Sequence, residues 1–212
     1  MEKSLGKYIK AICFLLLVGV SSCTSDEKIT KDPASEELVT EARNFLTGDI
    51  VLSTHATMNG VNKTLLESGC PTKFNFKWSE TDDNIFTISL LDFTVGNMGM
   101  VISFKCDVQT MQLNSWEQDE YKGSGWIKFY GEDGSTWGED EGNSSSAKGS
   151  NIKGYYNVYS HEINFIVDYN MMNVRSECFL QTVDKERINN YEEEFAQFEK
   201  DLEKYKEDHG LN

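Results

Sequence analysis

The feature that most constrains the fold is a two-residue alternation of apolar and polar side chains between Met98 and Val108. The apolar parity of this stretch consists of Met98, Met100, Ile102, Phe104, Cys106 and Val108. The other parity is polar apart from Val101. Such a period predicts a β-strand with one face in a core and the other in water. We therefore expect a fold built on an antiparallel sheet.

Seven further segments carry strand patterns, and turn residues separate most of them. The predicted strands are Asp49–Met58, Lys73–Trp78, Ile85–Phe93, Met98–Val108 with an extension toward Leu113, Gly123–Tyr130, Ile152–Tyr159, Glu162–Asn170 and Val174–Thr182. Most connections are too short for crossover helices, so consecutive strands should pair antiparallel. Closing about eight such strands on themselves removes the edges of the sheet. The sequence therefore predicts a mainly β fold, an eight-stranded antiparallel up-and-down barrel.

One helix is predicted before the barrel strands in the sequence and one after them. Ser35 is a suitable N-cap for a short N-terminal helix that ends near Gly48. Within residues 185–212 an apolar seam recurs at steps of three and four: Ile188, Tyr191, Phe195, Phe198, Leu202 and Tyr205. This spacing predicts a long C-terminal amphipathic helix. We expect the seam to pack on the chain's own barrel or N-terminal helix, and pairing with another molecule is the alternative.

Two segments of the chain are strongly polar. Gly131–Ser150 consists mostly of Gly, Ser and acidic residues, and its composition predicts a long mobile loop. Asn114–Lys122 is acidic and polar, and no strand or helix is assigned to it.

The first residues predict export and a lipid anchor. Three lysines precede the apolar run Ala11–Val20, which is too short to span a bilayer. Val20-Ser21-Ser22-Cys23 resembles the bacterial lipoprotein box, in which the cysteine is acylated and becomes the mature N-terminus. We therefore expect lipidation at Cys23. An ordinary cleaved signal peptide followed by a chance cysteine is the alternative.

These features predict four parts: a lipoprotein signal peptide (1–22), an acidic and polar tether (23–34), a barrel domain with its N-terminal helix (35–184) and the C-terminal helix (185–212). Thr24–Lys28 resembles the acidic tether of Bacteroidetes-type lipoproteins that are sent to the outer membrane. The resemblance implies a lipid-anchored protein of the cell outer membrane, exposed at the surface. The periplasmic face is the alternative.

The negative charge of the chain argues against partners that carry phosphate groups. The formal net charge is −15, and the signal segment is itself basic, so the remainder is more negative still. Such a charge repels phosphate backbones, which argues against nucleic-acid binding and against a basic membrane-surface helix.

Three cysteines remain after Cys13 and Cys23: Cys70, Cys106 and Cys178. An odd number permits at most one internal disulfide. Cys106 and Cys178 lie on the apolar parity of their strands, so we expect them to be core thiols. No CxxC motif indicates a thiolate metal site.

Motifs for catalysis are absent from the sequence, which contains no G-x-S-x-G, H-E-x-x-H or P-loop. We expect His55, His161 and His209 to face solvent, and we predict no catalytic residue and no cofactor. The acidic residues Glu132, Asp133, Glu139, Asp140 and Glu141 have the hard oxygen ligands that Ca²⁺ prefers. They lack the spacing of an EF-hand, so we predict a solvated loop and no metal site.

The segment Phe86–Val108 (FTISLLDFTVGNMGMVISFKCDV), together with the lipoprotein box and the strand count, resembles calycin-like, or lipocalin-like, lipoprotein families of unknown function from Bacteroidetes. The resemblance implies a barrel displayed at the envelope and a cavity for an apolar small molecule. These families bring no agreed catalytic residues.

Two functions remain open. In the first, a non-enzymatic barrel binds a small apolar ligand through side chains on the inward parities: Met100, Phe104, Phe129, Tyr156 and Phe165. In the second, the barrel is filled and the protein is a surface module that contacts glycan or protein through exposed aromatics: Trp116, Trp126, Trp137, Tyr155 and Tyr159.

Overall fold

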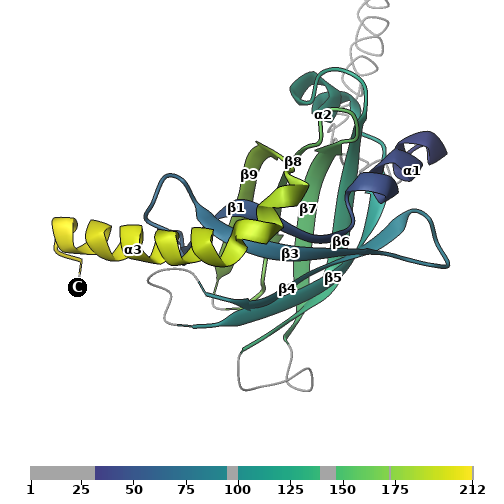
Figure 1. Ribbon diagram of the computed structural model, residues 1–212. Coiled ribbons are helices and arrows are strands. Elements are labelled where there is room, and N and C mark those ends of the chain that lie inside the picture. The colour runs from purple at the N-terminus through teal and green to yellow at the C-terminus, as the bar shows by residue number, and fades with distance from the viewer. Residues whose placement is uncertain (1–31, 95–99, 139–146, 172, 212) are drawn as a thin grey trace, which may run out of the picture.

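A computed structural model (Figure 1) describes residues 32–94, 100–138, 147–171 and 173–211. Its strands are β1 (Gly48–Met58), β2 (Val61–Asn62), β3 (Cys70–Trp78), β4 (Ile85–Phe93), β5 (Ile102–Met111), β6 (Trp126–Trp137), β7 (Ala147–Asn157), β8 (Glu162–Asp168) and β9 (Val174–Thr182). Its helices are α1 (Glu36–Phe45), α2 (Ser115–Glu120), the 3-10 turn η2 (Lys185–Asn190) and α3 (Tyr191–His209).

Eight strands form a closed antiparallel barrel, as predicted. Each strand from β3 to β8 pairs with the strand that follows it in the chain. Strand β1 pairs with β3 on one side and with β9 on the other, and the β1–β9 pairing closes the sheet. Thr54 in the middle of β1 is in register with Cys70 on one side and Cys178 on the other. Nearby, the Gln181 side chain accepts a hydrogen bond from Ser53 N–H (2.9 Å) and donates one to Ser53 O (2.9 Å). A side-chain amide thus continues the pairing where β9 turns away from β1.

The barrel interior is filled with apolar side chains, many of them aromatic. Along much of the longer strands buried residues alternate with more accessible ones, for example Ile88 and Leu90 of β4, or Phe104 and Cys106 of β5. The two-residue period therefore does what the sequence predicts, because alternate side chains of a pleated strand point to opposite faces. The hydrophobic effect of these fully buried groups is the main source of the stability of the barrel.

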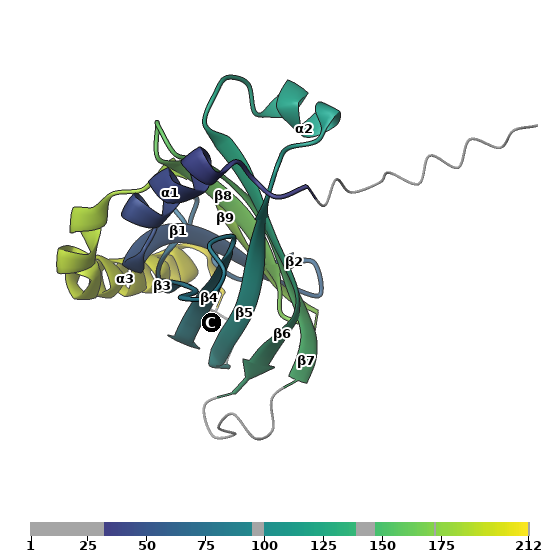
Figure 2. The ribbon, with the colours of Figure 1, turned by 90° about the vertical axis from the view of Figure 1, so that its right-hand side faces the viewer.

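Helix α1 covers the end of the barrel at which β5 ends and β6 begins (Figure 2). Ser35 Oγ accepts the N-cap bond from Leu38 N–H (3.4 Å), and Val39, Ala42 and Leu46 are buried. Gly48 adopts a positive φ of 78° where the chain turns from the helix into β1. The predicted helix is therefore confirmed, and its apolar stripe faces the core.

The boundaries of the central strand differ from the prediction. Its pairing begins at Ile102, opposite Phe93, and continues to Met111. Met100 lies in a bend before the strand, and Met98 falls outside the described residues. The alternation therefore extends beyond the residues that pair with a neighbouring strand.

The prediction of a long loop over Gly131–Ser150 is wrong at both ends. Strand β6 continues to Trp137 and β7 already begins at Ala147, and only residues 139–146 lie outside the described residues. A Cβ on Gly131 would lie 2.4 Å from Asp107 O, and one on Gly134 would lie 2.9 Å from Cys106 Cβ. These glycines permit close approach of β6 to β5, so a composition typical of loops is here a requirement of strand packing.

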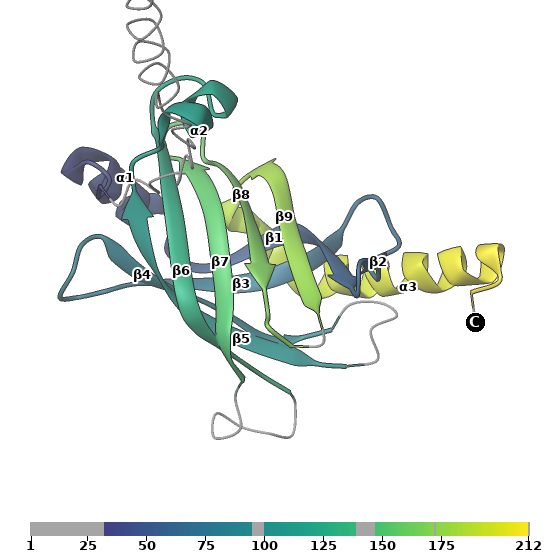
Figure 3. The ribbon, with the colours of Figure 1, turned by 180° about the vertical axis from the view of Figure 1, so that it is seen from behind.

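The C-terminal segment of 25 residues, η2 followed by α3, is helical and packs on its own barrel. Helix α3 lies across β3 and then extends past the barrel (Figure 1, Figure 3). Phe198 and Leu202 are buried within the single chain, and Lys73 Nζ lies 5.1 Å from the centre of the Tyr191 ring. The predicted seam thus contacts the chain's own barrel. Among the described residues, the helices are too short or too polar to cross a membrane.

Candidate functional site

The candidate site is a cleft at the α1 and α2 end of the barrel, with a volume of about 530 Å³. Its walls come from three segments: the start of α1 with Leu38, the end of β5 with Met111 and Leu113, and the stretch from Gln118 to Ile127. The polar groups of Ser35, Gln112 and Gln118 lie among these apolar walls. A cleft of this size that combines apolar and polar groups is compatible with a small-molecule site.

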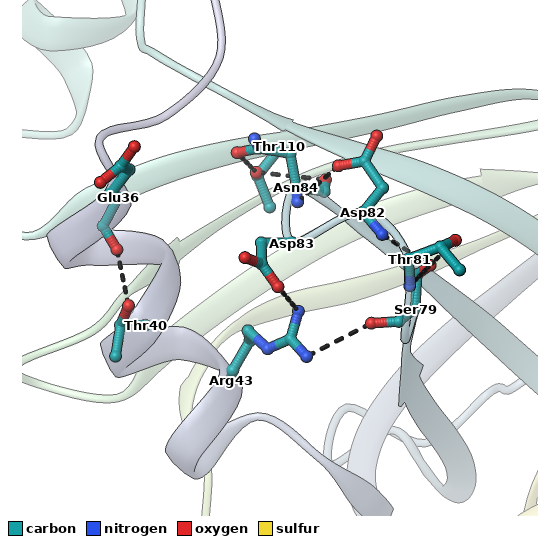
Figure 4. A network of polar contacts seen from close by, with 9 residues as sticks. All are labelled: Glu36, Thr40, Arg43, Ser79, Thr81, Asp82, Asp83, Asn84 and Thr110. Atoms are coloured by element: carbon teal, nitrogen blue, oxygen red, sulfur yellow. Dashed lines mark hydrogen bonds and ion pairs between the residues drawn. The ribbon is translucent and has the colours of Figure 1, made fainter.

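The position of α1 is fixed by polar contacts with the β3–β4 turn (Figure 4). Arg43 forms an ion pair with Asp83 (2.7 Å) and donates a hydrogen bond to Ser79 O (3.3 Å). The indole N–H of Trp78 donates a further bond to Leu46 O (2.7 Å) at the end of the helix. Together these contacts hold the Leu38 wall of the cleft in place.

The same turn is tied to the end of β5. Thr110 Oγ1 donates hydrogen bonds to Asn84 O (3.2 Å) and Asn84 Oδ1 (3.1 Å), and Thr110 N–H donates to Asn84 O (2.8 Å) (Figure 4). The chain before α1 also pairs here, because Gln112 N–H donates to Asp32 O (2.9 Å). The walls formed by α1 and β5 therefore belong to one hydrogen-bonded unit.

Helix α2, which the sequence analysis did not predict, forms the far side of the cleft. Asn114 and Glu117 form a capping box: Glu117 N–H donates to Asn114 Oδ1 (2.8 Å), and Asn114 N–H donates to Glu117 Oε2 (3.0 Å). The Asn-x-x-Glu spacing in the sequence was the signal for this helix start.

A buried ion pair holds α2 on the outer face of the barrel. Glu117 Oε1 lies 2.8 Å from Lys128 Nζ and 3.2 Å from Lys153 Nζ, and it accepts a hydrogen bond from Tyr155 Oη (2.8 Å). Burial alone would raise the pKa of Glu117, but the bonds from Lys128, Asn114 and Tyr155 outweigh burial and lower this pKa to about 2. Glu117 is therefore ionised at neutral pH, and both of its carboxylate oxygens have hydrogen-bond or ion-pair partners.

Aromatic rings lie beside the cleft. Tyr121 stacks on Tyr155 with ring centres 4.0 Å apart and tilts against Trp126 at 4.9 Å. Asn164 donates a hydrogen bond to Tyr121 Oη (2.7 Å), and Trp126 Nε1–H donates to Lys122 O (3.3 Å). These contacts fix the rings of Tyr121 and Trp126, which both line the cleft.

The residues predicted to line an interior cavity pack against one another or against other rings. Phe104, Phe129, Tyr156 and Phe165 are buried, and Met100 is half-buried. Ring centres are 6.0 Å apart for Phe129 and Phe165, and 5.5 Å apart for Phe104 and Tyr169. Of the predicted set, Phe129 and Phe165 are brought together, while Met100 belongs to the opposite end of the barrel.

The five aromatics predicted to be exposed differ in exposure, and Trp137 lies apart from the others. Trp116 is 74% exposed and Tyr159 is 55% exposed, whereas Tyr155 is buried under Tyr121, so its predicted exposure is wrong. Trp126 is half-buried at the start of β6, and Trp137 is half-buried at the other end of the same strand. Burial of Tyr155 follows from α2, which covers this part of the sheet.

Two of the three histidines, His55 and His161, are less exposed than predicted, whereas His209 is exposed as predicted. His161 stacks on Phe45 with ring centres 3.6 Å apart, and its Nδ1 lies 3.0 Å from Tyr156 Oη. His55 is partly buried, with Nε2 3.2 Å from Glu67 O, and His209 is exposed. His161 is therefore half-buried and contributes to the contact between α1 and the barrel.

The cysteines and acidic residues form no ligand set in the part of the chain that the structure describes. Cys70, Cys106 and Cys178 are free and buried, and burial raises the pKa of each thiol, to about 12 for Cys70 and Cys106. No group of three or more potential metal ligands gathers among the described residues. Cys23 and the acidic residues Glu139, Asp140 and Glu141 lie outside them.

Comparison with known proteins gives a family. Neither a curated protein nor a solved structure matches the chain. A family described as a domain of unknown function (DUF4903) matches residues 23–210, which is most of the chain. The chain, whose fold is the eight-stranded barrel described above, therefore belongs to this DUF4903 family.

Proposed function

We propose that this protein is a lipid-anchored, non-enzymatic binding protein of the bacterial outer membrane, with a calycin-like barrel that binds a small apolar or amphipathic ligand. The observation that carries the proposal is the cleft of about 530 Å³ between α1, β5 and α2. The anchor is acylated Cys23, and the family match begins at that residue. Several buried acyl methylenes, each contributing roughly 0.8 kcal/mol, would retain the chain at a membrane.

The cleft is a better ligand site than the barrel interior. In the interior the Phe165 ring packs against the rings of Phe74 and Phe129, with Phe74 and Phe165 centred 5.0 Å apart in an edge-to-face arrangement. A ligand in that position would have to displace well-packed side chains, which is costly in a close-packed core. The cleft needs no such displacement.

Glu117 and Tyr155, the buried titratable groups that hold α2 on the barrel, serve structural contacts, which favours binding over catalysis. Two lysines neutralise the charge of Glu117, and the Tyr155 hydroxyl donates a hydrogen bond to its carboxylate. Burial and the Glu117 carboxylate raise the pKa of Tyr155 above its ordinary value. A general acid or base needs a proton that it can exchange with substrate near the working pH. Neither group offers one at neutral pH.

A titration of the purified chain with the neutral fluorophore N-phenyl-1-naphthylamine tests the proposal. Gln112 is exposed and lines the cleft, so Gln112→Trp should fill the cleft from a position that loses no buried contact. Lys105→Trp is the matched control, because Lys105 is exposed on β5, the strand that ends just before Gln112, and does not line the cleft.

We expect saturable probe binding by the wild-type chain and by Lys105→Trp, and affinity lowered at least about tenfold in Gln112→Trp, equivalent to about 1.4 kcal/mol. Equal probe affinity in all three proteins would refute the cleft as the ligand site. Circular dichroism of each variant establishes that the fold is retained.

A further inference from the structure

We propose that the α2 end of the barrel rests on the membrane that holds the anchor, with the aromatic rim in the interface of a neutral, zwitterionic lipid surface. The aromatic rim is defined as Trp116, Tyr121, Trp126 and Tyr159. This inference rests on the proposed acylation of Cys23, and it adds the orientation of the barrel and the surface that meets the lipid.

The first observation is the point at which the chain joins the barrel. Asp32 O accepts a hydrogen bond from Gln112 N–H, Pro33 forms a β-bridge with Met111, and Ala34 N–H donates to Thr110 O (3.4 Å). These contacts attach the chain to the end of β5, three residues before α2 begins. The residues just after the tether are therefore fixed at the α2 end of the barrel.

The second observation is the short distance along the chain from this attachment to Cys23. Residues 23–32 would span at most about 30 Å when fully extended, and about 17 Å as a flexible coil. The far end of β5, at Ile102, is about 30 Å along the strand from Met111. An anchor at Cys23 thus brings the α2 end to the bilayer far more readily than the opposite end.

The third observation is the chemistry of the surface at that end. Trp116 is 74% exposed on α2, although α2 itself is held firmly by the capping box and by the pair of Glu117 with Lys128. Tyr159 is 55% exposed and lies against Gly125, because a Cβ built on Gly125 would be 2.5 Å from Cδ2 of Tyr159. Trp and Tyr are the residues that favour the membrane–water interface.

The charge of the chain selects the kind of lipid. Asp119 and Glu120 are exposed on α2, and the formal net charge of the whole chain is −15. An anionic surface would repel this protein, whereas a zwitterionic surface lets aromatic burial act without electrostatic opposition. Contact through rings rather than lysines should also depend little on salt concentration.

Fluorescence quenching in vesicles of bromine-labelled phosphatidylcholine tests the orientation. The acylated full chain, purified from membranes and reconstituted, is compared with Trp116→Phe and with Trp137→Phe, in which a half-buried tryptophan at the opposite end of β6 is removed. The bromine atoms quench only tryptophans that enter the lipid. We expect strong quenching in the full chain, loss of most of the quenched intensity in Trp116→Phe, and no such loss in Trp137→Phe.

The outcomes separate this inference from the anchor. Mass spectrometry of the same sample establishes whether Cys23 carries acyl groups, and their absence overturns both the anchor and the orientation. Acylated protein whose Trp116 is not quenched by the brominated lipid, or is quenched equally by acrylamide in solution and in vesicles, overturns the orientation alone.

Discussion

Lys128 Nζ lies 2.8 Å from Glu117 Oε1, and the side chains of both residues are more than nine-tenths buried. Lys128 is on the outer face of β6, so the pair joins the barrel wall to α2, whose Gln118 lines the cleft. A buried charge without its partner is strongly unfavourable, and this gives the contact its expected energetic weight.

Replacing Glu117 by alanine should lower the free energy of unfolding by about 3–5 kcal/mol, because it leaves the Lys128 ammonium buried and unpaired. Glu120→Ala, an exposed change on the same helix, should alter it by at most about 0.5 kcal/mol. Urea denaturation measures both variants. The double variant Glu117→Leu/Lys128→Met should recover most of the loss, since no charge is then stranded. Equal stabilities of Glu117→Ala and Glu120→Ala would show that the pair does not hold α2.

The Glu117 carboxylate should make the stability of the fold depend on pH in the acid range. Its folded pKa of about 2 lies below the ordinary value of 4.5, so the ionised form stabilises the fold fully above pH 4.5, and this contribution is lost as the pH falls toward 2. The loss should amount to about 3 kcal/mol. Denaturation of the wild-type chain and of Glu117→Gln across this range measures it, and the difference between them should shrink with falling pH. A constant difference would contradict the assigned pKa.

Gly154 should tolerate no side chain, because it lies in register between Phe129 and Phe165. A Cβ there would be 2.3 Å from the Phe129 ring and 2.4 Å from Phe165 Cβ. Gly154→Ala should therefore destabilise the barrel by about 3 kcal/mol or more through overpacking. At Gly138 the nearest atom to an added Cβ is Val101 O at 3.8 Å, so Gly138→Ala should be nearly neutral. Thermal unfolding compares the two; similar melting temperatures would mean that the interior is looser than described.

The three described cysteines should be unreactive while the protein is folded. Burial raises the pKa of the Cys70, Cys106 and Cys178 thiols, so at neutral pH they carry little thiolate and are shielded from reagent. Titration with Ellman's reagent should detect no reactive thiol in the acylated native chain and three after unfolding in guanidinium. One fast thiol in the native chain would identify Cys23 as unacylated and contradict the anchor.

The barrel could be predicted from the sequence because its signal is local. Residues such as Ile88 and Phe104 alternate with polar neighbours, and the two-residue period follows from strand geometry alone. The same reasoning failed where strand pairing requires a small residue. Gly131 and Gly134 indicate a loop by composition, yet both lie in β6. Glycine is required there because Cys106 and Asp107 occupy the space that a side chain would need.

The candidate site could not be predicted, because its walls come from segments that are remote in sequence. Leu38 meets Leu113 and Trp126 only after α1 docks through Arg43 and Asp83, a contact that no local pattern indicates. The Asn114-x-x-Glu117 spacing would have revealed α2, but nothing local indicates that Glu117 binds Lys128. Burial of Tyr155 depends on that contact and was missed with it.

Methyl NMR during titration with N-phenyl-1-naphthylamine tests the central claim, a ligand site in the cleft outside the packed interior. The account predicts that resonances of Leu38, Met111 and Leu113, which line the cleft, shift with increasing probe, while those of Ile88, Leu90 and Val167 in the core stay unchanged. Shifts confined to the core methyls would contradict it and place the ligand inside the barrel.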